Sequence, residues 1–413
     1  MVWLYHFFRF LFLGGVGIAA IRNEKAKKWI WGRKYWEKTL KQDWKITPGE
    51  KVIWMHCASA GEFEQGRPLL ESIKKSNPGV RLILTFFSPS GYEMHKDYKE
   101  VSKVMYLPFD GSKNAKQFIE IIQPCLAIFV KYEFWYFYLT TLKKHQIPTL
   151  LVSGIFRPKQ PFFQWWGGFH RKMLDCFTFF FLQDTASMQL LESIGYKSNV
   201  MISGDTRFDR VAELAAHPIN LPSVESFCME KVLVAGSTWP KDDQLLQEWY
   251  LQQKGWKLLL VPHEIDNEYI SDLQKRFPSA IRYSELSGNE NLVSFSTLII
   301  DTIGILSKIY RYATLCYIGG GFQKGGHHNI LEAAVYGKAV VTGPHIEKFS
   351  ESIALNQLSG SFLVQKSDDL LILTNDLKRI EEAGKKAGSY VNMNLGATKK
   401  IMEWIDASAV IKK

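Results

Sequence analysis

Short hydrophobic runs alternate with longer amphipathic stretches along the first half of the chain. Seven of these runs are almost continuously apolar and rich in β-branched and aromatic residues. Runs of this kind are typical of strands in a parallel sheet that is covered on both faces. The runs are residues 51–56, 81–87, 104–109, 126–132, 149–156, 177–183 and 199–205.

The same rhythm restarts in the second half, after a polar, proline-containing stretch at 215–226. Two such series predict an α/β protein with two doubly wound domains. We expect a first domain at 46–214, a linker at 215–230 and a second domain at 231–413, whose last helix can pack back on the first domain. The second series of runs is 231–238, 257–263, 280–284, 297–301, 313–320, 338–344 and 361–364.

Residues 1–45 follow a different pattern. Positions 2–21 are apolar and aromatic apart from His6 and Arg9, and a basic segment follows them. A helix that spans a membrane needs about 20 apolar residues, so this segment suits a spanning helix and a helix lying in the interface equally. Basic residues on one flank predict that the rest of the chain stays on the cytoplasmic side, next to anionic lipid. The alternative is an amphipathic helix packed on the body or on a partner.

The positive charge of the chain is concentrated in this arm. The 413 residues carry a net charge of +10, and residues 1–45 hold ten Lys/Arg against three acidic residues, a net +7. The body is therefore nearly neutral, which argues against a groove that follows a polynucleotide and against a nucleic-acid partner. The hydrophobic fraction of 46% excludes a disordered chain.

The five cysteines are far apart and include no C-x-x-C pair. This usage predicts reduced thiols in a cytosolic body, with neither a disulfide framework nor a zinc site.

In such sheets, ligands bind beyond the carboxyl ends of the strands, and a cleft between two domains is the default site. The first candidate motif at a strand end is HCASAGEF at 56–63. Glu62 would lie at a helix N-terminus, where the helix dipole favours the ionised form of a general base, and Ser59 and Gly61 allow close approach of a ligand. The alternative is a capping box formed by Ser59 and Glu62, with no chemistry.

Two further motifs lie at the ends of first-domain strands. TFFSPSGY at 85–92 brings the hydroxyls of Ser88 and Ser90, and KYEFW at 131–135 brings Glu133 beside two aromatic residues. A carboxylate among aromatic side chains suits contact with a sugar, although a surface glutamate before a helix would have the same sequence.

The second domain has glycines and hydroxyls at its strand ends, in AGST at 235–238 and in GGG at 319–321. Such turns can bring backbone N–H groups to a phosphate. The segment GGHHNILE at 325–332 places Asn329 and Glu332 near a helix start, where they suit either ribose hydroxyls or capping. No P-loop motif occurs. His327 and His328 are adjacent and lack a third spaced ligand, so we expect no metal site.

Together these motifs resemble the Kdo transferase family, whose members transfer 3-deoxy-D-manno-octulosonic acid from CMP-Kdo to a lipid A precursor. The resemblance spans almost the whole chain in ten ordered motifs. They are SAGE (59–62), TFFSPSGYE (85–93), KYEFW (131–135), GDTRFD (204–209), AGST (235–238), LLVPH (259–263), IDTIGIL (300–306), YIGGGF (317–322), GHHNILEAA (326–334) and GKAVVTGPH (337–345).

The resemblance implies a GT-B fold with two Rossmann-like domains facing a cleft, the first binding the acceptor and the second the CMP-sugar. It also implies inversion at the anomeric carbon without metal or cofactor, CMP-Kdo as a substrate, and an N-terminal anchor at the inner membrane, with the body on the cytoplasmic face. Glu62 matches the family's proposed catalytic base, and Glu133 matches its second acidic residue.

The resemblance also assigns binding residues. Acceptor or Kdo contacts fall on Ser59, Gly61, Ser88, Ser90 and Arg157. Donor contacts fall on Ser237, Thr238, Pro262, His263, Ile303, Gly304, Gly319, Gly320, Gly321, His327, Asn329 and Glu332.

The chain departs from the family at three positions. Tyr92 and His263 stand where the family often has arginine, and Arg157 is displaced by two positions. The alternatives are another GT-B enzyme that uses a UDP-sugar and a lipid-linked acceptor, or a non-catalytic, membrane-attached binding protein.

Overall fold

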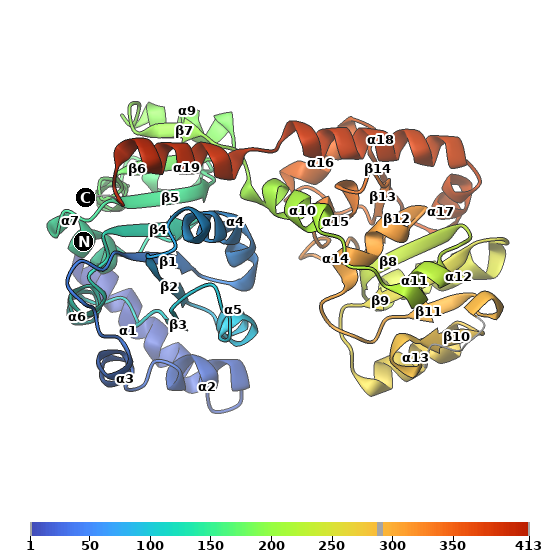
Figure 1. The fold of residues 1–413 in the computed structure, drawn as a ribbon, viewed down its shortest axis with the longest axis horizontal. Coiled ribbons are helices and arrows are strands. Elements are labelled where there is room, and N and C mark those ends of the chain that lie inside the picture. Colours follow the sequence, from blue (N-terminus) through green and yellow to red (C-terminus); the bar gives the residue numbers. More distant parts are fainter. Residues whose placement is uncertain (1, 287–291, 412–413) are drawn as a thin grey trace. The chain divides into compact units, whose positions relative to one another are not determined.

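The computed structural model describes residues 2–286 and 292–411. The chain forms two compact units, residues 1–210 with 396–413, and residues 211–395. Each contains one sheet of seven parallel strands with helices on both faces (Figure 1). This α/β fold with two doubly wound sheets is the one predicted from the alternation of apolar runs and amphipathic stretches.

The first sheet has the strand order β3-β2-β1-β4-β5-β6-β7. The order reverses between β1 and β4, and such a switch point is where parallel sheets bind ligands. The strands are β1 (Val52–Cys57), β2 (Arg81–Phe86), β3 (Lys103–Tyr106), β4 (Leu126–Val130), β5 (Thr149–Gly154), β6 (Phe179–Leu182) and β7 (Val200–Ile202).

Side chains that alternate along each strand of this sheet build two cores. Trp54 of β1 belongs to a core with helices α3, α6, α7, α8 and α9, whereas Ile53 and Met55 face a core with α4 and α19. The helices are α3 (Trp36–Asp43), α4 (Ala60–Ser76), α5 (Pro89–His95), α6 (Ser112–Ile122), α7 (Tyr136–Lys144), α8 (Gly168–Leu174), α9 (Thr185–Ser193), α10 (Thr206–Ala216) and α19 (Ala397–Ser408).

The second sheet has the order β10-β11-β9-β8-β12-β13-β14, with its switch point between β8 and β12. Its strands are β8 (Val232–Thr238), β9 (Lys257–Pro262), β10 (Ala280–Arg282), β11 (Thr297–Ile299), β12 (Leu315–Ile318), β13 (Val340–Thr342) and β14 (Ser361–Leu363). Its helices are α11 (Pro222–Phe227), α12 (Pro240–Gln252), α13 (Asn267–Arg276), α14 (Leu306–Ile309), α15 (Leu331–Ala334), α16 (Ser350–Gln357), α17 (Ser367–Thr374) and α18 (Leu377–Met393).

The limits of the units differ from the sequence boundaries at the expected linker. Residues 215–230 contain α11, whose Val224 and Phe227 are buried, and they belong to the second unit. At 395–396 the chain returns to the first unit, where Ile401 and Ile405 of α19 join the core beside α4. Apolar side chains, rather than the polar composition of the linker, decide both limits.

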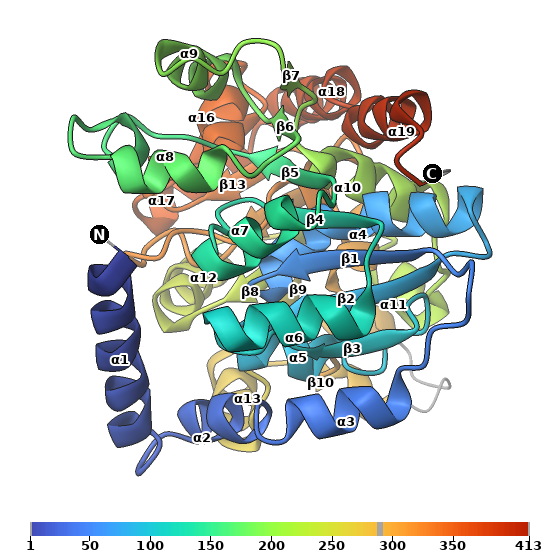
Figure 2. The same ribbon diagram turned by 90° about the vertical axis from the view of Figure 1, so that its left-hand side faces the viewer.

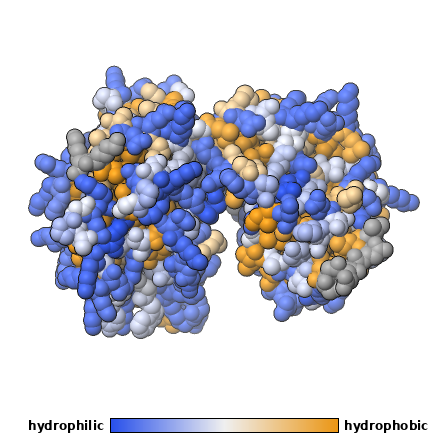
Figure 3. Space-filling view, in the orientation of Figure 1, coloured by the Kyte–Doolittle hydropathy of each residue, from blue (hydrophilic) through white to orange (hydrophobic). Residues whose placement is uncertain are grey.

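The N-terminal arm forms α1 (Val2–Ala19) and α2 (Glu24–Trp31), followed by α3. Figure 2 shows α1 at the side of the first unit, with α2 and α3 leading from it to the sheet. By length and composition α1 could cross a membrane, and none of its residues is buried. Hydrophilic side chains cover most of the face in Figure 3, interrupted by exposed hydrophobic patches.

Candidate active site

His56 lies at the centre of a buried polar network at the ends of β1, β2 and β4. Its Nε2 lies 3.0 Å from Glu133 Oε2, and its Nδ1 lies 2.8 Å from Thr85 Oγ1. Trp54 Nε1 donates to that same hydroxyl oxygen, at 2.8 Å. His56 Nδ1 also lies 3.1 Å from the Thr85 carbonyl oxygen, and the Trp135 indole Nε1 lies 3.2 Å from His56 Nε2, so the network holds the imidazole ring from both sides.

Trp135 holds Glu133 from the other side. Its indole Nε1 donates to Glu133 Oε2 at 2.6 Å, and its ring lies 4.8 Å from that of Phe87. The Glu133 residue is only 7% exposed. A buried carboxylate that contacts two ring nitrogens through one oxygen is fixed in place. Glu133 thus has the aromatic surroundings that the sequence predicts for it.

Glu62 is the third residue of α4, and its carboxylate forms the capping box that the sequence allowed. Its Oε2 accepts from the Ser59 N–H at 2.9 Å and lies 3.3 Å from the Ser59 hydroxyl. Burial raises the pKa of the Glu62 carboxyl, and the nearby Glu133 carboxylate raises it further, whereas His56 and the Ser59 bond oppose the rise. In return, the Glu62 N–H donates to the Ser59 hydroxyl at 3.4 Å. Both carboxylate contacts use Oε2, so capping leaves Oε1 for a substrate proton.

The other predicted first-unit residues surround these carboxylates at neighbouring strand ends. Ser88 caps α5, where its hydroxyl accepts from the Gly91 N–H at 3.3 Å and lies 3.0 Å from the Ser90 hydroxyl. Burial raises the pKa of Tyr132, and the charge of Arg157 beside it opposes the rise. Arg157 is exposed, so its guanidinium can reach a ligand.

In the second unit, the turn at 319–321 approaches the end of β8 closely. A Cβ on Gly319 would lie 2.3 Å from the Ser237 carbonyl oxygen, so only glycine fits there. Asp242 fixes the turn by accepting from the Gly320 N–H at 2.9 Å and from the Tyr317 hydroxyl at 2.7 Å. Ser237 is half-buried, with φ +53°, whereas Thr238 is fully buried.

Trp239, His263 and His328 form a cluster of rings at the ends of β8 and β9. The His263 ring stacks on Trp239 with centroids 4.4 Å apart and on His328 with centroids 4.6 Å apart. Trp239 Nε1 donates to His328 Nε2 at 3.4 Å. Burial lowers the pKa of His328 to about 4, helped by the charges of His263 and His327. This ring is therefore neutral near pH 7.

The remaining donor-side residues have different surroundings. Asn329 donates to Glu332 Oε1 at 3.2 Å and accepts from the Leu331 N–H, so both take part in the helix start. His327 is buried, with Nε2 2.8 Å from the Ser352 hydroxyl. Ile303 is 87% exposed and precedes Gly304 at φ +90°, and Pro262 ends β9.

The structure brings Glu62, Glu133 and Ser59 together with two residues that were not assigned a role from the sequence, His56 and Trp135. Both lie inside the motifs HCASAGEF and KYEFW, so their position there was a signal. Trp239 and His328 were missed in the second unit, and each directly adjoins a predicted residue. Within residues 2–286 and 292–411, no group of three His, Cys, Asp or Glu side chains is arranged to hold a metal ion.

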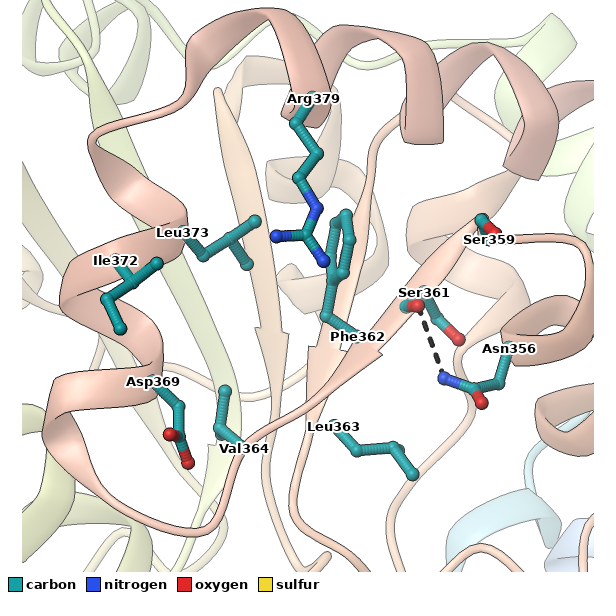
Figure 4. Close-up of a pocket in the computed structure, with 10 residues that line it drawn as sticks. All are labelled: Asn356, Ser359, Ser361, Phe362, Leu363, Val364, Asp369, Ile372, Leu373 and Arg379. Carbon is teal, nitrogen blue, oxygen red and sulfur yellow. Dashed lines mark hydrogen bonds between the residues drawn. The ribbon is translucent and has the colours of Figure 1, made fainter.

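A pocket of about 410 Å³ lies elsewhere in the second unit, between β14 and helices α16, α17 and α18 (Figure 4). There the Arg379 guanidinium lies 4.9 Å from the Phe362 ring centroid, and Asn356 Nδ2 donates to the Ser361 carbonyl. None of the predicted site residues lines it.

The two-sheet fold is shared with solved structures that match most of this chain. Acinetobacter baumannii MurG has a TM-score of 0.54 at 12% identity, covering 86% of this chain and 99% of that one. Neisseria meningitidis UDP-GlcNAc 2-epimerase, bound to UDP-GlcNAc, has a TM-score of 0.59 at 14% identity, covering 86% and 98%. The fold is therefore of the GT-B type.

Sequence relatives are more specific. Residues 33–210 match the family model for 3-deoxy-D-manno-octulosonic-acid transferase (kdotransferase). The Aquifex aeolicus 3-deoxy-D-manno-octulosonic acid transferase is 25% identical over 357 residues, covering 82% of this chain and 92% of that protein. The Chlamydia muridarum enzyme of the same name is 26% identical over 354 residues, covering 82% and 80%.

A bifunctional glycosyltransferase/methyltransferase of Fusobacterium nucleatum is 27% identical over 339 residues, which is 79% of this chain. The match spans only about half of that relative, 51%. Taken together, the fold is of the GT-B class, and these relatives, which match most of the chain, are glycosyltransferases by name. The chain is, more particularly, a relative of the Kdo transferases over most of its length, and the resemblance seen in the motifs is confirmed.

Proposed function

We propose that the chain transfers Kdo from CMP-Kdo to a sugar hydroxyl of a lipid A precursor, with inversion of the anomeric carbon and without metal or cofactor. The observation that carries the proposal is the carboxylate pair of Glu62 and Glu133. It lies in the unit that matches the Kdo transferase family model, at the carboxyl ends of the strands beside the switch point.

Glu62 is the general base in this mechanism. Its Oε1 removes the proton of the acceptor hydroxyl as that oxygen bonds to the anomeric carbon, and the bond to CMP breaks with its electron pair on the phosphate. The raised pKa of Glu62 suits this role, because a stronger base accepts the proton more readily. His56 and Trp135 hold Glu133 beside it, where Glu133 orients the acceptor.

On the donor side, the leaving phosphate is stabilised by hydrogen bonds from the Ser237 hydroxyl and from the Gly321 N–H of the 319–321 turn. The Gly319 and Gly320 N–H groups of this turn already donate to the Gly236 carbonyl and to Asp242. Asp242 fixes this turn before substrate binds, so its dipoles need no rearrangement during the reaction. The exposed loop around Ile303 and Gly304 is the candidate for base recognition, and Asn329 and Glu332 for the ribose.

We also propose that the protein works at the cytoplasmic face of the inner membrane. Support comes from the apolar α1, from the basic residues that follow it and from the membrane location of a lipid acceptor.

The test is incubation of the purified full chain with CMP-Kdo and a tetra-acylated lipid A precursor, measuring CMP release and the mass of the product. We expect one or more Kdo additions by the wild type, no product from Glu62→Ala and normal product from the control Glu64→Ala on the same helix. Activity should survive EDTA. Folded wild type that releases no CMP contradicts the proposal. Product that forms only with a UDP-sugar would show that the donor is a UDP-sugar and not CMP-Kdo.

A further inference from the structure

The apolar surface of α1 is too large to remain in water. All of its side chains are at least partly exposed, and the large hydrophobic ones at positions 3, 7, 10 and 18 are exposed by 50–74%. Soluble monomers rarely expose a contiguous apolar patch larger than a few hundred Å². Something therefore covers this helix in the cell.

One stripe of α1 is nevertheless held against the first unit. The Tyr5 hydroxyl donates to Asp110 Oδ2 at 2.6 Å, and Asp110, only 1% exposed, also accepts from two backbone N–H groups of α7. The Arg9 guanidinium lies 5.2 Å from the Phe109 ring centroid, and Phe12 stacks on Phe109 at 5.6 Å. Positions 5, 9 and 12 share one face of a helix.

The opposite face carries the most exposed side chains. Trp3, Phe7, Phe10 and Ile18 are exposed by 72%, 50%, 74% and 73%, and their spacing places them on one stripe. Ile21, just beyond the helix, continues the stripe and is 74% exposed.

This docking is incompatible with a helix that crosses a bilayer. Eighteen residues extend about 27 Å, which is slightly less than the hydrocarbon thickness of about 30 Å. A crossing helix would need all of its turns in lipid, whereas Tyr5, Arg9 and Phe12 occupy more than two turns of α1 and lie against the protein. A helix in the membrane plane keeps this stripe on the protein and places the opposite stripe in lipid.

The residues near α1 fit the surface of an anionic membrane. Arg22, Lys25, Lys28 and Lys34 are exposed along the segment after α1. Trp165, exposed by 92%, lies three residues before the start of α8, and α8 meets the N-terminal end of α1 where Phe169 lies 5.9 Å from Tyr5 (Figure 2). Tryptophan and basic side chains are typical of the membrane–water interface.

We propose that α1 lies in the plane of an anionic bilayer, clamped to the first unit by Tyr5, Arg9 and Phe12, and does not cross it. Aromatic contacts then connect the membrane-attached helix α1 to the candidate site. Phe12 lies 6.0 Å from Phe87, and Phe87 lies 4.8 Å from Trp135, which donates to Glu133. An acceptor whose acyl chains stay in the bilayer can thus present its sugar to the site. This last step rests on the proposed function, whereas the in-plane position does not.

The first test asks whether the clamp persists on the membrane. Cysteines at positions 12 and 109 of the full chain, as Phe12→Cys with Phe109→Cys, are treated with a short bis-maleimide on sealed phosphatidylglycerol-containing vesicles and in detergent. Each single variant controls for the five native thiols. We expect the same internal crosslink in both conditions. A crosslink that forms in detergent and is lost on vesicles overturns the proposal.

The second test asks on which side the N-terminus lies. A protease-cleavable tag is added before Met1, and the protein is bound from outside to the same sealed vesicles. We expect external protease to remove the tag, as it does in detergent. A tag that is protected until the vesicles are opened means that α1 crosses the bilayer, which overturns the proposal.

The third test identifies the lipid-facing stripe. We expect the combined Trp3→Ser, Phe10→Ser and Ile18→Ser variant to bind vesicles about 100-fold more weakly, because three large apolar side chains no longer enter lipid. The matched control is Leu251→Ser, Ile372→Ser and Met393→Ser, which changes three comparably exposed residues of the second unit. Equal loss in both variants overturns the assignment of the stripe. None of these measurements depends on Kdo transfer, so they fail or succeed independently of the proposed function.

Discussion

His56 and Glu133, which lie 77 positions apart in the sequence, form a buried hydrogen bond of 3.0 Å at the heart of the first unit. Thr85 contacts the other ring nitrogen, so the imidazole ring is held on both sides and its Nε2 faces the carboxylate. The contact orients Glu133 without itself touching a substrate. His56 is therefore a positioning residue.

Replacing His56 should separate orientation from binding. We expect His56→Ala to lower kcat by about 10- to 100-fold, because a shift of about 1 Å in a reacting group costs this much, with a smaller change in KM for the lipid. His56→Gln keeps a donor and should recover part of kcat. A purely structural role would instead give equal losses for both variants, in parallel with their stability.

Substitution of Glu62 should abolish chemistry without unfolding the chain. We expect Glu62→Gln to lower kcat by about 10²- to 10⁴-fold, the usual contribution of a general base. Glutamine also serves at this position of a capping box, so thermal unfolding should change little. Glu64→Gln, on the same helix, is the matched control and should keep kcat. A Glu62→Gln enzyme with wild-type kcat would refute the base assignment.

The acid limb of the pH–rate profile should respond to the neighbours of Glu62. Its raised pKa means that activity is lost as pH falls, with a midpoint above the ordinary value for glutamate. Lys131 lowers this pKa, so Lys131→Gln should move the limb to higher pH. Removal of the Glu133 charge in Glu133→Gln should move the limb of the residual activity to lower pH. Acid limbs that coincide in the wild type, Lys131→Gln and Glu133→Gln would contradict the effect of these two neighbours on Glu62.

Asp243 should make the stability of the second unit depend on pH. Burial raises the pKa of this fully buried carboxyl to about 6. The folded state then binds more protons than the unfolded state between about pH 4 and 6, so stability falls as pH rises through this range, by about 3 kcal/mol. Asp243→Asn, which keeps an acceptor for Tyr269, should remove this fall. Calorimetry of both proteins at pH 4.5 and pH 7 measures the change in the free energy of unfolding between the two pH values. An equal change in both proteins would contradict the prediction.

The ring cluster of the second unit should contribute to nucleotide binding. We expect Trp239→Ala to raise the Kd for CMP by about 3- to 10-fold, the value of an aromatic contact of 0.5–1.5 kcal/mol, with Trp239→Phe less affected. Titration calorimetry with CMP measures both. Trp256→Phe, in the core of the same unit, is the control for general loss of packing. Unchanged affinity in Trp239→Ala would contradict a contact between the nucleotide and this ring cluster.

The strands were predictable because a strand that is buried on both faces consists of consecutive apolar residues. Each of the fourteen apolar runs overlaps a strand, from β1 to β14. The limits of the units were not predictable in the same way. Val224 and Phe227 are two of several apolar residues in the stretch at 215–230, where Ile219 and Met229 are exposed, and their burial depends on the neighbouring elements that surround them.

The candidate site shows the same division. Glu62 and Glu133 could be chosen from the sequence because each follows an apolar strand and carries a carboxylate. His56 lies near the end of a strand whose other residues are typical of a core. Nothing in the local sequence distinguishes a histidine that packs in a core from one that contacts a distant carboxylate. Trp239 and His328 likewise form a cluster only because the His263 ring, on a separate loop, stacks on both of them.

By itself, the sequence determined the two doubly wound sheets, the strand ends that carry carboxylates and glycines, the relation to the Kdo transferases and an apolar, basic N-terminal arm. These follow from composition and local order, since hydrophobic periodicity and short motifs act over a few residues. The tertiary structure decided which oxygen of Glu62 is left free, that His56 orients Glu133, and that one stripe of α1 lies against Asp110 and Phe109. Those contacts join residues far apart in the chain, and only the packing of the folded protein brings them together.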